Sequence, residues 1–257
     1  MNPTLEVAHL DLASPHDVIC ENLSLCVRPG EVWGILGPNG VGKSTLLKTL
    51  AGLRPAPEGS SIRLDGQPLE RWARRARARR MAILLQDNEP GLPLTVFETA
   101  LLGRHPHLGL WGRPHHGDLR RTLSALRIAG LLGQRQSPSQ ALSAGESRRL
   151  SVALILAQDP DLYLLDEPTT QLDLHYQRRL FEHFLGLARK RGKAIVMALH
   201  DPTAAIRFTT RVLLLLGGGR TVVGDSRDCL TPEHLTALYG TDVVAAHSPR
   251  GLVFDVF

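Results

Sequence analysis

The stretch Gly37-Pro38-Asn39-Gly40-Val41-Gly42-Lys43-Ser44-Thr45 fills the pattern G-x-x-x-x-G-K-[ST]. An apolar run at 32–36 precedes it, and a helix-like stretch at 46–53 follows it. In a strand-loop-helix unit of this kind, backbone N–H groups of the loop turn toward phosphate oxygens and the helix directs its positive end at them. We expect Lys43 to reach the outer phosphates and Ser44 to hold Mg²⁺. The stretch therefore predicts a site for a nucleoside triphosphate.

Two neighbouring acids follow another apolar run, Leu162-Tyr163-Leu164-Leu165, and precede Pro168. Ligands of open α/β sheets collect at the carboxyl ends of strands, so Asp166 and Glu167 are candidates for the same site. Because side chains alternate along a strand, both acids can face one ligand only if the chain leaves the extended form there, which Pro168 favours. We expect Asp166 to hold Mg²⁺, directly or through water, and Glu167 to orient and deprotonate the attacking water. Taken alone, these residues also fit a strand that ends in an acidic turn.

Apolar runs of strand length alternate with helical patterns along the chain, which predicts an α/β fold whose mostly parallel sheet is covered on both faces. The expected strands and helices of this core are strands at 81–85, 162–165, 194–199 and 212–216 and helices at 143–157 and 177–191. Shorter apolar stretches at 4–12, 18–28 and 61–65 indicate an N-terminal antiparallel subdomain. A helix at 232–239 and a strand near 252–256 are expected at the end of the chain.

Residues 95–132 space their apolar positions as helices do, and a Gly-, Pro- and His-rich loop is expected at 103–117. We therefore expect one domain, 1–257, with an inserted α-helical subdomain at about 87–158. Four histidines fall in the expected loop, at 105, 107, 115 and 116, and they are interpreted as polar loop residues in preference to metal ligands.

Bulk properties limit where the chain works. Its longest aliphatic run, 212–216, is far shorter than the roughly 20 residues of a membrane helix, and its N-terminus lacks a secretory pattern. The three cysteines, at 20, 26 and 229, lack metal-ligand pair spacing and are too few for a disulfide scaffold, which favours the cytoplasm. The formal charge of +5 is concentrated in an arginine-alanine stretch at 71–80, which predicts an exposed helix with a basic face, either solvated or in contact with lipid, phosphate or a partner.

The segment Leu142-Ser143-Ala144-Gly145-Glu146 supports two interpretations. Ser143 and Glu146 have the spacing of a capping box before the helical stretch 150–157, which explains both residues without a ligand. A helix N-terminus approached by small residues also binds phosphate. The segment lies shortly before the strand that carries Asp166, so the second interpretation stays open.

In order and approximate spacing, these motifs resemble those of ABC (ATP-binding cassette) ATPases. The matching positions span nearly the whole chain: 37–45, Gln86 after a strand, 142–146, 166–168, 172–173 and His200 after a strand. The resemblance implies ATP hydrolysis with Mg²⁺ by two cassettes that close head to tail. Ser143, Gly145 and Glu146 of one copy would then complete the ATP site of the other copy.

The resemblance also implies roles for three single residues. Gln86 would contact Mg²⁺ or the water and sense a membrane partner, Asp173 would communicate across the dimer interface, and His200 would contact the γ-phosphate. Outside this series, Gln86 would be an ordinary polar strand end and Asp173 a helix start. A lone histidine at a strand end is usually structural or solvent-facing.

Further details, at 102–107, 166–169, 172–174 and 199–202, resemble the ATPases of importers for ferric siderophores, haem or cobalamin. This resemblance implies a peripheral protein on the cytoplasmic face of the inner membrane. Its partners would be transmembrane permease subunits, a second copy of the chain and, indirectly, a substrate-binding protein, with no nucleic acid expected. A coupling helix of the permease would dock on 86–104, with Leu94, Val96 and Phe97 as apolar contacts.

Two other functions remain as alternatives. A non-transport ABC ATPase acting on nucleic acid or ribosomes would fit the basic charge, but such relatives generally carry a long coiled-coil insertion or two fused cassettes. A P-loop kinase or GTPase would leave 142–146 and His200 unexplained. Three positions also depart from the usual ABC pattern: Ala144 replaces a glycine, Leu154 replaces a frequent arginine, and His16 is the nearest ring where an adenine-stacking aromatic is expected.

Overall fold

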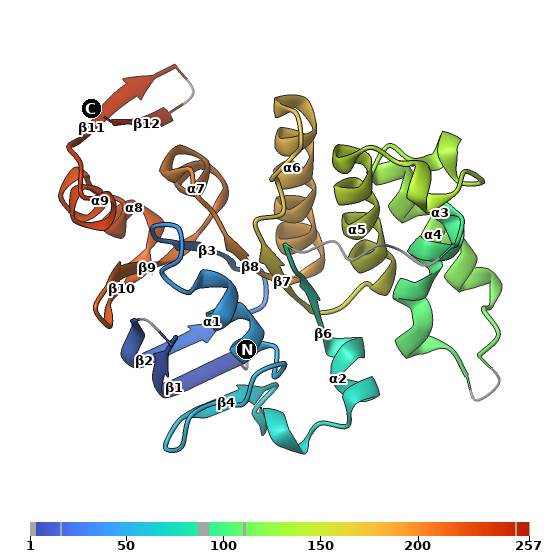
Figure 1. The fold of residues 1–257 in the computed structure, drawn as a ribbon, viewed down its shortest axis with the longest axis horizontal. Helices are drawn as coiled ribbons and strands as arrows, with labels where there is room; N and C mark the ends of the chain where they lie inside the picture. The colour runs from blue at the N-terminus through green and yellow to red at the C-terminus, as the bar shows by residue number, and fades with distance from the viewer. Residues whose placement is uncertain (1–3, 16, 87–92, 110–111, 250, 257) are drawn as a thin grey trace.

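The computed structural model describes residues 4–15, 17–86, 93–109, 112–249 and 251–256. Its central sheet has six strands in the order β10-β9-β3-β8-β7-β6 (Figure 1). The neighbouring pairs from β9 to β6 are parallel, and only β10 joins antiparallel. The mostly parallel sheet expected from the sequence is therefore confirmed. The strands are β3 (Val32–Leu36), β6 (Met81–Leu84), β7 (Leu162–Asp166), β8 (Ala194–Ala198), β9 (Arg211–Gly217) and β10 (Arg220–Asp225).

The central strands are apolar throughout because both faces of the sheet are covered. Every residue of β3, β7 and β8 is buried, and successive side chains enter two different cores. Leu162 and Leu164 pack in the core that contains helix α1 (Lys43–Leu50), whereas Tyr163 and Leu165 pack in the core of helices α5 (Ala144–Gln158) and α6 (Leu174–Arg191). Two-sided burial is what continuous apolar runs in a parallel sheet indicate.

A second, antiparallel sheet lies at the N-terminal side of the molecule, as expected. Its strands pair in the order β2-β1-β4-β5. Buried residues of β2 share the core of α1, so this sheet supports the loop that precedes the helix. The strands are β1 (Leu5–Ala13), β2 (Val18–Val27), β4 (Ser61–Leu64) and β5 (Gln67–Pro68).

The described residues between β6 and β7 are mostly helical (Figure 1). In the order of the chain the helical elements are α3 (Val96–Leu101), the 3-10 helix η2 (Leu102–His107), α4 (His116–Ile128), the 3-10 turns η3 (Leu132–Gln134) and η4 (Ser139–Ala141), and α5.

The loop expected at 103–117 is wrong in part, because its beginning is helical and its end starts α4. Arg104 is 6% exposed and donates to Asp118 at 2.9 Å and to the carbonyls of Ala157 and Gln158. His107 also contacts the Gln158 carbonyl at 2.9 Å. These hydrogen bonds join the segment to residues far along the sequence and hold it in a helical form, which its composition does not indicate.

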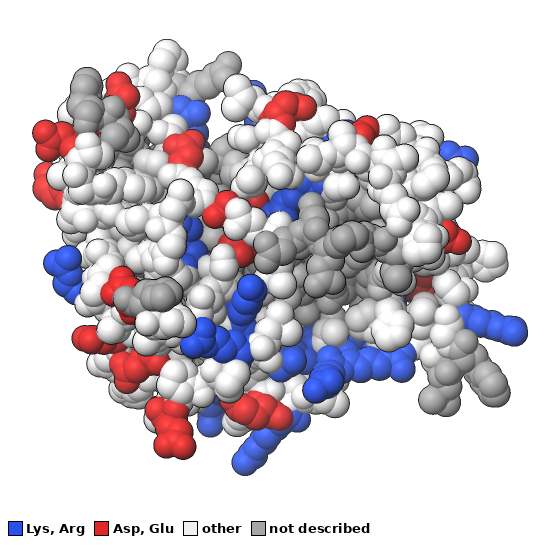
Figure 2. Space-filling model, in the orientation of Figure 1, with Lys and Arg blue, Asp and Glu red and all other residues white. Residues whose placement is uncertain are grey.

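The arginine-rich helix is shorter than expected. A 3-10 turn, η1 (Leu69–Arg71), precedes α2 (Arg74–Arg80), and α2 buries none of its residues. Figure 2 shows Lys and Arg side chains gathered over the part of the face where α2 lies. Arg75 and Arg79 both donate to the carbonyl of Pro106, so this exposed helix is tied to the helical elements.

The last part of the chain holds elements that the apolar pattern predicts only partly. Helix α9 (Pro232–Tyr239) is confirmed. Helix α6 begins three residues before the apolar pattern at 177–191, and Asp173 caps it, as expected of a residue that starts a helix. The elements missed by the pattern are α7 (Pro202–Phe208), β10, α8 (Ser226–Cys229) and β11 (Val243–Ser248), which pairs with the expected strand β12 (Gly251–Val256). Among the helices of the described segments, none combines the length and apolar character needed to cross a bilayer.

Candidate active site

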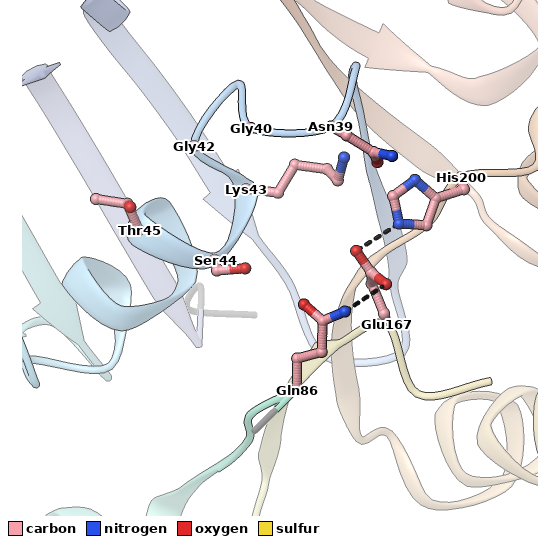
Figure 3. A pocket seen from close by; sticks show the side chains of 9 residues that line it. All are labelled: Asn39, Gly40, Gly42, Lys43, Ser44, Thr45, Gln86, Glu167 and His200. Carbon is pink, nitrogen blue, oxygen red and sulfur yellow. Dashed lines mark hydrogen bonds and ion pairs between the residues drawn. The ribbon is translucent and has the colours of Figure 1, made fainter. Parts of the chain in front are cut away.

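A cavity of about 490 Å³ lies at the carboxyl ends of four central strands. The phosphate loop after β3 meets the segments that follow β6, β7 and β8 there (Figure 3). The structure thereby brings together residues that are far apart in the sequence: Asn39, Gly40, Gly42, Lys43, Ser44, Thr45, Gln86, Glu167 and His200 line the cavity.

Glycines give the phosphate loop its shape. Gly40 and Gly42 have φ values of +81° and +108°, which L-residues with a side chain rarely adopt. A Cβ atom on Gly42 would lie 2.5 Å from Ile19, and one on Gly37 would lie 2.8 Å from Val41. Gly42 is also the N-cap of α1 and offers no side chain to the first N–H groups, which leaves them available to an anion.

Lys43 brings a buried positive charge to the cavity. It is 5% exposed, and its Nζ donates to the carbonyls of Gly37 at 2.7 Å and Pro38 at 3.0 Å. Burial lowers the pKa of Lys43, and the carboxylates of Glu167 and Asp166 oppose that change. The lysine therefore sits between the loop that would hold phosphates and the two acids.

The two acids face the same site because the chain turns sharply between them. Asp166 is the last residue of β7 and is 1% exposed, whereas Glu167 has a φ of +47° and has left the strand. Burial raises the pKa of Asp166, and a hydrogen bond with Ser44 partly opposes this. The departure from extended structure that the sequence required is therefore present.

Glu167 lies at the centre of a polar cluster. Its carboxylate accepts from Gln86 Nε2 at 3.3 Å and from Thr170 Oγ1 at 3.1 Å, and it pairs with Nε2 of His200 (Figure 3). Three strands thus each contribute one member: β6 leads to Gln86, β7 to Glu167 and β8 to His200. A carboxylate held in this way is suited to accept a proton from water.

The same region fits a magnesium ion. The Oδ1 atom of Asp166 is buried without a hydrogen-bond partner among the described residues, and the Ser44 hydroxyl lies beside this carboxyl. Gln86 adds an amide oxygen on the side of Ser44 (Figure 3). Hydroxyl, carboxylate and amide oxygens are hard donors, and Mg²⁺ typically takes one or two carboxylates together with substrate phosphates and water.

Seven predicted residues are not among those that line the cavity. Gly37, Pro38 and Asp166 belong to the segments that form it, whereas Ser143, Gly145, Glu146 and Asp173 lie at the beginnings of two helices. Ser143 and Glu146 form the expected capping box of α5, with Glu146 Oε2 accepting from the Ser143 N–H at 2.9 Å. Bonds from Gln134 and Ser143 lower the pKa of Glu146 to about 2. Asp173 accepts from the Tyr176 N–H at 2.9 Å as the cap of α6, and a Cβ on Gly145 would lie 3.0 Å from the Gln171 carbonyl. Within one chain these residues begin two helices.

Two residues that the sequence did not single out donate to backbone carbonyls of the site segments without lining the cavity. Arg148 of α5 is 2% exposed and donates to backbone carbonyls next to Gln86 and Glu167. The hydroxyl of Tyr239, at the end of α9, donates to the His200 carbonyl at 3.0 Å. An arginine in the polar first half of a helix and a tyrosine near the end of the chain carry no local signal of such contacts.

Other expectations have mixed outcomes. Val96 is fully buried, so it cannot be an exposed contact for a permease, whereas Leu94 and Phe97 are half-buried. Leu154 is half-buried against the core of α5 and α6, and a Cβ on Gly103 would lie 2.1 Å from its carbonyl. His16, the nearest ring to an adenine, lies outside the described residues.

The sheet, the glycine loop and the acids at the strand ends define a nucleotide-binding ATPase of the P-loop class. Residues 20–170 match the family model described as ABC transporter. The chain belongs to the ABC transporter ATPase family, and it is an ATP hydrolase.

Relatives of this family match the chain almost from end to end. It is 39% identical over 264 residues to the hemin import ATP-binding protein HmuV of Burkholderia lata, covering 96% of this chain and 97% of that protein. It is 34% identical over 247 residues to the iron(3+)-hydroxamate import ATP-binding protein FhuC of Bacillus subtilis, covering 96% and 91%.

Solved structures agree with the fold. A structure described as an inward-facing conformation of a metal-chelate type ABC transporter matches with a TM-score of 0.84 and 25% identity, covering 100% of this chain and 97% of that one. The ADP conformation of an ABC transporter cassette matches with a TM-score of 0.77 at 18% identity, covering 93% and 100%.

Proposed function

We propose that this chain is the ATP-hydrolysing subunit of an importer for a metal chelate of the haem or ferric-siderophore kind. The observation that carries the proposal is the cluster of Glu167 with Gln86 and His200 opposite the phosphate loop. Full-length similarity to proteins named for hemin and iron(3+)-hydroxamate import supports the choice of cargo. The chain would work on the cytoplasmic face of the inner membrane, bound to permease subunits and served indirectly by a substrate-binding protein.

The proposed chemistry is phosphoryl transfer to water. Glu167 takes the proton of the attacking water, and His200 both orients that carboxylate and contacts the γ-phosphate. Lys43 and the N–H groups of the loop place positive charge against the phosphate oxygens. Ser44, Asp166 and Gln86 would hold Mg²⁺, which when bound offsets charge on the β- and γ-phosphates.

A second copy of the chain would complete each site. In one chain, Ser143, Gly145, Glu146 and Asp173 lie outside the cavity, at the beginnings of α5 and α6. The capping box holds the tip of α5 in a fixed shape, and the tip of a helix can accept a phosphate of a neighbouring molecule. A symmetric dimer then holds two ATP molecules, each between one phosphate loop and the partner's α5.

The permease would dock on the helical subdomain proposed at about 87–158. Leu94 and Phe97, which are half-buried, are the expected apolar contacts that remain after Val96 is excluded. Leu102 of η2, which is 45% exposed, is added to them. Binding of nucleic acid is not expected. The basic surface is confined to one short helix, α2, and the named relatives are import proteins.

Replacement of the proposed base tests the hydrolytic assignment. We expect Glu167→Gln to bind ATP, to form a dimer with it and to hydrolyse it on the order of 100-fold or more slowly, because general-base catalysis typically contributes 10²–10⁴-fold. Glu58→Gln, at an exposed residue that does not line the cavity, is the control. Undiminished turnover of Glu167→Gln would remove Glu167 from this role.

Co-purification tests the transport assignment. The tagged chain should bring down multi-spanning membrane proteins from the membrane fraction, and ATPase activity of the complex should respond to a binding protein loaded with haem or a ferric siderophore. Recovery of ribosomes or nucleic acid in place of a permease would contradict the importer and favour a non-transport ATPase.

A further inference from the structure

Arg148 is a buried cation that the proposed chemistry has not yet used. Its side chain is 2% exposed and forms no ion pair with a carboxylate among the described residues. Burial lowers its pKa, while the charges of Asp166 and Glu167 oppose that change. An arginine placed so deeply needs oxygen acceptors that match its planar donors.

The two terminal nitrogens of its guanidinium find such acceptors at the ends of two neighbouring strands, whereas Nε has no partner among the described residues. Nη1 donates to the Leu85 carbonyl at 2.7 Å, and Nη2 donates to the carbonyls of Asp166 at 2.5 Å and Glu167 at 2.7 Å. β6 and β7 are parallel neighbours, with Leu84 beside Leu165. Arg148 therefore fastens together the two chain segments that leave this edge of the sheet.

These segments carry the residues that hold the proposed water. Gln86 directly follows Leu85, and its side chain donates to Glu167. Glu167 itself has a φ of +47°, a conformation that residues with a side chain rarely adopt. Arg148 donates to the carbonyls on either side of the Glu167 Cα atom, which supports this turn, so the guanidinium fixes where the carboxylate points.

The same arginine connects the turn to the tip of α5. Ser143, the cap of that helix, lies five residues before Arg148, which is about 7.5 Å along a helix. A helix transmits displacement along its axis with little bending over so short a length. A shift of the α5 tip would therefore pull on the carbonyls beside Gln86 and Glu167.

We propose that Arg148 is a positioning residue that orients Glu167 and Gln86 and couples their geometry to the tip of α5. The proposal rests on the proposed role of Glu167 as the base. It assigns Arg148 no contact with ATP, so substitutions there should slow the chemical step while leaving nucleotide affinity nearly unchanged.

Two substitutions in the full-length chain test this. Arg148→Lys keeps the charge but replaces a fork with a single point donor, and Arg148→Met removes every donor. We expect kcat to fall on the order of 10-fold for Lys and 100-fold for Met, since residues that orient an active group typically contribute that much. The Kd for ATP and KM should stay within about 3-fold of the parent, because the phosphate loop is untouched.

Arg104→Lys is the matched control. Arg104 is also buried and also donates to backbone carbonyls, in its case those of Ala157 and Gln158 at the C-terminal end of α5, whereas Arg148 lies near the N-terminal end of that helix. It should lower thermal stability as Arg148→Lys does and leave basal kcat unchanged. If both lysine variants lower kcat equally, the loss reflects general destabilisation of α5 and the proposal is overturned.

A double substitution tests whether Arg148 acts through Glu167 or independently of it. If Arg148 acts through Glu167, adding Arg148→Lys to Glu167→Gln should reduce kcat little further. A full additional loss would show an independent effect and overturn the proposal. If Glu167→Gln is slow but the Arg148 variants keep the parent kcat, only the positioning role of Arg148 is overturned. If Glu167→Gln turns over ATP as fast as the parent, both the proposed base and the positioning role are refuted.

Discussion

Gly42 offers a direct test of the loop geometry. Its φ is +108°, and an added Cβ would lie 2.5 Å from two atoms of the buried Ile19 side chain. Gly42→Ala therefore meets two costs: the strained backbone costs about 1–2 kcal/mol, and overpacking costs about 1–3 kcal/mol more. We expect the free energy of unfolding to fall by about 2–5 kcal/mol in total.

Gly40→Ala separates these two costs. Gly40 has a φ of +81° in the same loop, but apart from its chain neighbours no atom of the described residues lies within 4 Å of the position that its Cβ would take. Gly40→Ala should lose only the backbone part, about 1–2 kcal/mol. Denaturant unfolding of both variants measures the difference, and fluorescence titration with a labelled ATP analogue should show much weaker binding by Gly42→Ala.

Ile19→Ala provides the relief test. The substitution alone removes buried side-chain atoms and should cost about 2–5 kcal/mol, but it also removes the atoms that a methyl on Gly42 would meet. The double variant should therefore be about 1–3 kcal/mol more stable than the sum of the single changes predicts. Strict additivity, or a Gly42→Ala variant as stable as Gly40→Ala, would refute the argument from overlap.

Two further predictions concern contacts behind and beside the site. Tyr239→Phe removes the donor to the His200 carbonyl. Burial raises the pKa of Tyr239 to about 12, so its hydroxyl is protonated and donates at neutral pH. A hydrogen bond worth about 0.5–1.5 kcal/mol corresponds to a fall in kcat of roughly 2- to 10-fold when the donor is lost. Tyr163→Phe, at another buried tyrosine, is the control, and equal kcat values for the two variants would contradict a role for this contact. Asp159→Asn should lower the free energy of unfolding by about 1–2 kcal/mol at pH 7. Burial alone would raise the pKa of Asp159, but Arg191, Lys193 and Arg121 lower it overall, so the ionised carboxylate stabilises the folded chain. That stabilisation is present above the unfolded pKa of about 3.9 and is lost as the pH falls through the lower folded pKa. The difference in unfolding free energy between parent and variant should therefore shrink in acid, and a difference that grows in acid would contradict the lowered pKa of Asp159.

The parts of the site that the sequence predicts are those with local or edge-defined geometry. The phosphate loop is contiguous, and its glycines state their own backbone requirement. Glu167 and His200 each follow a buried strand, and the carboxyl ends of parallel strands meet at one edge of a sheet. Strand-end geometry places Gln86 at the same edge, but a role for Gln86 and His200 in the site is predicted only through the resemblance to ABC ATPases.

The parts that could not be predicted depend on long-range packing. Arg148 looks like any polar residue of a helix, and only the seating of α5 against the ends of β6 and β7 buries it. Arg104 pairs with Asp118 fourteen residues away and with the end of α5, so a segment with loop-like composition becomes a 3-10 helix. Val96 looked available for docking because its burial comes from neighbouring helices.

Subunit complementation tests most directly whether each ATP site is shared between two chains. Lys43→Met disables the phosphate loop of a chain, and Ser143→Phe disables the helix tip that this chain would offer to its partner. Each variant alone should be nearly inactive, but a mixed dimer pairs the intact loop of one chain with the intact tip of the other. Random mixing should restore about a quarter of the parent turnover, because half of the dimers carry one complete site. Turnover of the mixture no greater than the mean of the two separate variants would contradict the shared site.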